Sequence, residues 1–196
     1  MILEEKKLKE IKNRVQQYIQ EGIIKTKNPK EHADFFLRNA EDSLNSALCL
    51  YDISTNKEFQ EHVGYPNLRG FLWVINASYY SMFYNVRAML EHEGIKIQSD
   101  LSIHARTFDA LVYFFYLTGK LKKILFEHYS QAQEEASELL GQQKADELVQ
   151  EYFFEKGKRA TFTYQTGEHA MQSKAKTSID RAVKFNRELR RMINEK

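Results

Sequence analysis

The segment from Arg159 to His169 combines the residue types needed to bind and cleave a phosphodiester. Arg159 supplies a guanidinium, Tyr164 a phenol and His169 an imidazole, in a polar stretch just before the last predicted helix. An arginine can hold a phosphate through two parallel hydrogen bonds, and a helix N-terminus favours anions. Cleavage needs such a cation together with a group that can move a proton. The segment therefore predicts a phosphate site; the alternative is that Arg159 pairs with acidic residues and Tyr164 caps a helical bundle.

A second polar cluster lies on the most apolar predicted helix, residues 70–93. Tyr80 follows Asn76 by four residues and precedes Arg87 by seven, so the three side chains share one helix face. Burying an unpaired asparagine or arginine is costly, so this face requires partners. A ligand, a second subunit, the Arg159 segment or an internal polar network could supply them.

Familiar metal and cofactor motifs are missing from the sequence. The eight glycines are scattered, which leaves no glycine-rich phosphate loop, and no His-Glu-x-x-His motif or cysteine pair is present to build a zinc site. We therefore expect neither a metal nor a cofactor. The single cysteine, Cys49, excludes an internal disulfide and is typical of a reducing cytoplasm.

Composition predicts an all-α protein. The 196 residues contain only two prolines and eight glycines, whereas a β sandwich or barrel needs a turn signal about every 8–12 residues. No apolar run approaches the roughly 20 residues of a membrane span, and no signal peptide is visible, so we expect a cytoplasmic chain without membrane contact.

Charge is distributed unevenly along the chain. Residues 1–30 carry a net charge of +4, residues 31–155 a net charge of −9 and residues 156–196 a net charge of +7. Such a pattern indicates a solvated helix face, an anion-binding surface or charge complementarity within the molecule or across a dimer.

Apolar periodicity and helix stop signals divide the chain into helices. They predict helices over residues 3–25, 29–56, 70–93, about 102–118, 121–140 and 144–155, and a last helix after His169. Residues 56–69 are predicted to form a loop. Asn28 and Pro29 suit the start of the second helix, Gly94 suits the end of the third, and Gly141 is expected to end the helix that begins at residue 121.

Four segments together resemble one known family. They are the run from Ala77 to Leu90 with Gly94-Ile95, the Ser102-Ile103-His104 triplet, Thr118-Gly119-Lys120-Leu121, and the stretch from Arg159 to Tyr164. Their order and spacing over residues 33–195 resemble the small stand-alone prokaryotic branch of the HEPN superfamily. The resemblance implies an up-and-down bundle of four to five helices over residues 29–196. Residues 1–28 lie outside it and are predicted to form an added N-terminal helical extension for dimerisation or docking.

The resemblance also implies a function. HEPN proteins are commonly homodimers linked to RNA, and many are metal-independent ribonucleases or toxins whose antitoxin is a small nucleotidyltransferase. Their signature is an arginine, four to six residues and then a histidine. Here Arg159 is followed after four residues by Tyr164, a poor base at neutral pH, and His169 comes after nine. His169 or His104 would have to carry the proton instead.

Three functional hypotheses follow. The first choice is an RNA- or nucleotide-binding HEPN protein with weakened or no nuclease activity, which uses Asn76, Tyr80, Arg87 and His104 for binding alongside Arg159. The first alternative is a metal-independent endoribonuclease toxin, with Arg159, Tyr164 and His169 as catalytic residues. The second alternative is a non-catalytic dimer or partner-binding module that uses the basic last helix.

Overall fold

The computed structural model describes residues 5–27, 31–98, 102–153 and 161–194, and their side chains outside residues 140–169. The elements, in chain order, are α1 (Glu5–Gln20), β1 (Ile24–Lys25), α2 (Ala33–Thr55), α3 (Lys57–His62), α4 (Phe71–His92), β2 (Lys96–Ile97), α5 (Ile103–Leu111), the π-helix η1 (Val112–Tyr116), α6 (Lys123–Phe153) and α7 (Thr161–Asn194). The predominance of helix confirms the all-α prediction. Every helix in the described ranges is too short or too polar to cross a membrane.

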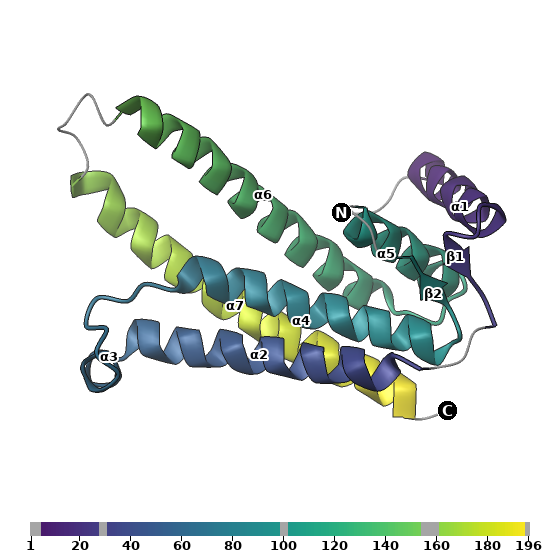
Figure 1. The fold of residues 1–196 in the computed structure, drawn as a ribbon, viewed down its shortest axis with the longest axis horizontal. Coiled ribbons are helices and arrows are strands. Elements are labelled where there is room, and N and C mark those ends of the chain that lie inside the picture. Colours follow the sequence, from purple (N-terminus) through teal and green to yellow (C-terminus); the bar gives the residue numbers. More distant parts are fainter. Residues whose placement is uncertain (1–4, 28–30, 99–101, 154–160, 195–196) are drawn as a thin grey trace.

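Helix α4 lies at the centre of the fold, with α2 and α7 alongside it (Figure 1). Successive long helices, α2, α4, α6 and α7, run in alternating directions, and α6 diverges from the other three toward its C-terminal end (Figure 1). Small residues recur every seven positions on α2, where Ala33, Ala40 and Ala47 are buried. Residues seven apart lie on one helix face, so these alanines let α2 approach α4 closely.

Helical spacing of apolar residues predicts one buried face on the last helix, formed by Ala175, Ile179, Ala182, Leu189 and Ile193. In α7 the first four are buried and Ile193 is half-buried, which confirms this face. On the same helix, the ring of Phe185 stacks on Tyr129 of α6 with a centroid distance of 5.7 Å, and neither side chain is exposed. Burial of such large side chains supplies most of the free energy that holds the long helices together.

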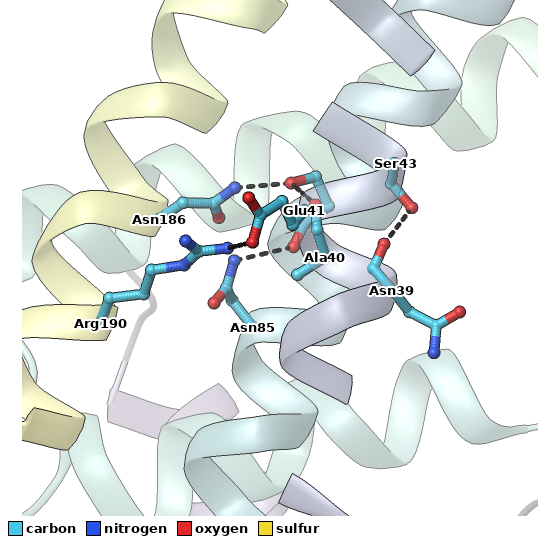
Figure 2. A network of polar contacts seen from close by, with 8 residues as sticks. Asn39, Ala40, Glu41, Ser43, Asn85, Asn186 and Arg190 are labelled. Atoms are coloured by element: carbon cyan, nitrogen blue, oxygen red, sulfur yellow. Dashed lines mark hydrogen bonds and ion pairs between the residues drawn. The ribbon is translucent and has the colours of Figure 1, made fainter. Parts of the chain in front are cut away.

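A buried polar network joins α2, α4 and α7 (Figure 2). Ser81 Oγ donates a hydrogen bond of 2.7 Å to the carbonyl of Ala40, and Asn186 Nδ2 donates one of 2.5 Å to Ser81 Oγ. Nearer the surface, Arg190 of α7 reaches Glu41 of α2 at 3.5 Å (Figure 2). The network therefore fixes the register of three helices through one serine.

The acidic and basic segments of the sequence partly neutralise each other through an ion pair inside the molecule. Arg181, from the basic C-terminal segment, donates two hydrogen bonds of 2.7 and 3.1 Å to the carboxylate of Glu135, from the acidic segment. This two-point contact is the strong form of an ion pair.

The N-terminal extension packs onto the main core. Ile11 and Val15 of α1 and Ile24 of β1 are fully buried in the same apolar cluster as α4. Arg14 holds both carboxylate oxygens of Asp109 on α5 at 2.9 Å. The domain boundary expected at residue 28 lies outside the described residues and stays a prediction.

Several predicted element boundaries were wrong. Helix α1 ends at Gln20, because Gly22 turns the chain with a φ of +71° and β1 follows. The predicted loop 56–69 contains the short helix α3. Helix α6 continues through Gly141, since one helical glycine costs only about 1 kcal/mol and its neighbours favour helix.

Other boundaries agree with the structure. Helix α4 spans the predicted range, and Gly94 after it has a φ of +73°. Helix α5 follows Ser102, although the serine side chain makes no capping hydrogen bond. The Asn28-Pro29 start signal lies outside the described residues.

Candidate functional site

One side of α4 leaves aromatic side chains exposed. Trp73 and Tyr80, which are seven residues apart, are 58% and 36% exposed, and Tyr84 on the same side is half-buried. The ring of Phe36 on α2 stacks against Tyr84 with a centroid distance of 6.3 Å. We call Trp73, Tyr80, Tyr84 and Phe36 the aromatic face. A planar group could stack on such a surface.

His104 of α5 borders the aromatic face. Its Nδ1 lies 2.8 Å from the hydroxyl of Tyr79. Its ring packs on Phe83 at a centroid distance of 4.3 Å and meets Tyr80 edge-on at 5.5 Å. These contacts on three sides fix the orientation of the imidazole.

The protonation states of Tyr79 and His104 determine which hydrogen bonds His104 can form. Burial, with a smaller contribution from Arg87, lowers the pKa of His104, so the ring is neutral at pH 7. Burial raises the pKa of Tyr79, which therefore stays protonated and can donate to Nδ1. A neutral ring that accepts at Nδ1 carries its own proton on Nε2. When the Tyr79 hydroxyl is the donor in this contact, the Nε2 proton of His104 is available to donate a hydrogen bond to a ligand.

Arg87 lies beneath the aromatic face and contacts other parts of the protein. It is 4% exposed, its Nη2 donates to the carbonyl of Ile97 at 3.3 Å, and its guanidinium lies 4.7 Å from the ring centroid of Phe36. Burial lowers the pKa of Arg87, and the buried carboxyl of Glu91 counteracts this effect. In this structure Arg87 anchors β2 and supports Phe36; its predicted contact with a ligand stays a prediction.

Asn76 lies one helical turn before Tyr80. It is 5% exposed, and among the described residues neither its amide oxygen nor its amide nitrogen finds a hydrogen-bond partner. An unpaired buried amide is costly, so this position departs from ordinary packing. The described residues therefore do not supply Asn76 with the internal polar network that was one of its predicted partners.

The three predicted catalytic residues are only partly within the described structure. Arg159 lies outside the described residues. Tyr164 and His169 belong to α7, which begins at Thr161. The stretch that was predicted to be irregular up to His169 is therefore helical from Thr161 on. The side chains of Tyr164 and His169 lie outside the described part of the structure, so their catalytic roles stay predictions.

Tyr80 and His104, both predicted from the sequence, are brought together by the fold.

No family model, curated protein or solved structure matches this chain. HEPN membership therefore stays a prediction.

Sequence reasoning missed two residues of the site, Trp73 and Tyr79. The seven-residue spacing from Trp73 to Tyr80 was a visible signal, but nothing local links Tyr79 to a histidine 25 positions away.

The lowered pKa of His104 predicts acid sensitivity. The unfolded chain takes up a proton at a pH near 6.5, before the folded chain does, so folding stability is lost as the pH falls through this range. Urea unfolding between about pH 7.5 and pH 5.5 should show a smaller loss in His104→Gln than in the wild type. His62→Gln, at an exposed position, is the control. Equal losses in all three proteins would contradict the assignment.

Proposed function

We propose that this chain is a HEPN-like helical bundle that binds RNA or a nucleotide by stacking a base on the aromatic face. The observation that carries the proposal is the exposure of Trp73 and Tyr80 on one side of α4, with His104 beside Tyr80. Every nucleobase has a π face, so such a surface binds bases with little sequence preference. The Nε2 proton of His104 supplies a donor for a base or phosphate oxygen.

Binding without efficient cleavage is the form of this function that we favour. Arg159 lacks the closely following histidine of the HEPN signature, and His104 is engaged at Nδ1 by Tyr79. Arg159 and Tyr164 remain the proposed phosphate contacts. A homodimer, a cytoplasmic location and a nucleotidyltransferase partner belong to the same proposal.

Fluorescence anisotropy tests the proposal directly. Purified chain is titrated against a labelled unstructured RNA and against a labelled mononucleotide in EDTA, at several salt concentrations. We expect saturable binding that weakens as salt rises, since phosphate contacts release counterions. A flat titration at about 50 mM salt for both ligands would overturn the proposal.

Gel analysis of the same RNA separates binding from catalysis. We expect intact RNA after incubation in EDTA. Cleavage that disappears in Arg159→Ala would instead establish the metal-independent endoribonuclease. Loss of a protein partner on charge reversal of Arg190 and Arg191, without any nucleotide affinity, would establish the partner-binding module.

A further inference from the structure

Two lysines face each other across the β1–β2 ladder. The strands are antiparallel and pair Ile24 with Ile97 and Lys25 with Lys96. Side chains alternate across a strand, so the isoleucines enter the core while both lysines are exposed on the other face. The two residues that meet on the outer face of this small sheet therefore carry the same charge.

Like charges directly opposite each other destabilise a strand pair. Among the described residues, no carboxylate lies within ion-pair distance of either lysine. Glu91 interacts electrostatically with Lys96, but it is buried and interacts more strongly with Arg87. Water and salt ions therefore screen the repulsion between the exposed Lys25 and Lys96, and no carboxylate of the described residues neutralises it.

The same lysines line a hollow of about 300 Å³ together with Gly22, Ile23 and Gln98. This volume is in the range of small-ligand sites. Lysine ammonium groups and the Gln98 amide are hydrogen-bond donors, which suits an anion with several oxygens.

The backbone around the hollow is held in place by hydrogen bonds and by core packing. Arg87 bonds the carbonyl of Ile97, Gln98 N donates to the carbonyl of Ile23 at 2.9 Å, and Ile24 is buried in the core. A fixed backbone lowers the entropy lost on binding, so that only the exposed side chains of the hollow have to be ordered by the ligand.

We propose that the β1–β2 hollow binds a phosphate group, with Lys25 from the N-terminal extension and Lys96 from the bundle as its two cationic contacts. The choice of phosphate over other anions rests on the proposed function. A negative group between the ammonium groups turns their mutual repulsion into two attractions. The N-terminal extension thereby contributes a binding residue as well as core contacts.

Tripolyphosphate tests this site without any base that could stack. Its binding to the full chain is measured by calorimetry and by the shift in Tm, with chloride at matched ionic strength as reference. We expect a rise in Tm for the wild type, and at least a tenfold loss of affinity in Lys25→Gln and in Lys96→Gln. Lys57→Gln, on α3 at the opposite end of the molecule, should behave like the wild type (Figure 1).

A second readout shows that the variants fold. At low salt without phosphate, Lys25→Gln and Lys96→Gln should unfold at or above the wild-type Tm, because each removes the repulsion.

RNA titration of the same variants identifies the phosphate source. A salt slope reduced by about one per lysine assigns the site to the RNA backbone, whereas an unchanged slope assigns it to a free nucleotide.

Other outcomes separate this site from the proposed function. Wild-type tripolyphosphate affinity in Lys25→Gln and Lys96→Gln would overturn the site, and so would absence of binding to the wild type, even if RNA still bound through the aromatic face. Tripolyphosphate binding that depends on both lysines, in a chain that binds neither RNA nor nucleotide, would support the site and overturn the base-stacking proposal.

Discussion

Replacing Tyr80 by leucine is expected to weaken RNA binding roughly 5- to 150-fold, since stacking of a base on an aromatic side chain is worth about 1–3 kcal/mol. Tyr80 is 36% exposed and leucine is a good helix former, so the fold should tolerate the change. Anisotropy titrations with the unstructured RNA give the ratio of dissociation constants. Tyr80→Phe keeps the ring and should bind within about twofold of the wild type if stacking is the main contribution.

Tyr65 provides a matched control for this prediction. It is 65% exposed and follows α3, which lies at the end of the molecule away from α5, the helix that carries His104 (Figure 1). Tyr65→Leu removes an equally large exposed ring and should leave RNA affinity unchanged. Equal weakening in Tyr65→Leu and Tyr80→Leu, or none in Tyr80→Leu, would rule out the aromatic face as the base-binding surface.

Replacing Arg14 by alanine is expected to lower the free energy of unfolding by about 2–3 kcal/mol at pH 7. The Asp109 side chain is 5% exposed, and both of its oxygens are held by Arg14, so the variant leaves a buried carboxylate without its cation. The effect should fall below the roughly 3–5 kcal/mol seen for wholly buried pairs, because the Arg14 side chain is 44% exposed. Urea denaturation followed by circular dichroism measures it.

A double-mutant cycle isolates the Arg14–Asp109 interaction. The combined variant Arg14→Ala/Asp109→Ala should be less destabilised than the sum of the two single variants, since it no longer buries an unpaired charge. Lys176→Ala breaks an exposed pair with Asp180 and should cost about 0.5 kcal/mol or less. A strictly additive cycle would show that the N-terminal helix is held by its apolar contacts alone.

The elements of this fold that depend on local pattern were predictable from the sequence. Apolar residues at helical spacing located α4 and the buried face of α7, and Gly94 marked the end of α4 correctly. Such signals lie within a few residues of one another, so they act before any tertiary contact forms. The same reasoning failed at Gly141, because the cost of one helical glycine is small compared with the preferences of its neighbours.

The residues of the candidate site could likewise be predicted only in part from local sequence patterns. Helical spacing placed Asn76, Tyr80 and Arg87 on one face, yet burial leaves only Tyr80 of the three exposed there and turns Arg87 toward Ile97 and Phe36. Exposure depends on which neighbouring helices cover a face, and the spacing within one helix carries no record of that.

What the sequence by itself determined is therefore the all-α class, most of the long helices and their apolar faces. Tertiary structure alone decided the contact of Tyr79 with His104, the ion pair of Arg14 with Asp109 and the opposition of Lys25 and Lys96. These pairs join residues 25 to 95 positions apart, and only the packing of helices and the pairing of strands that are distant in the chain bring them together.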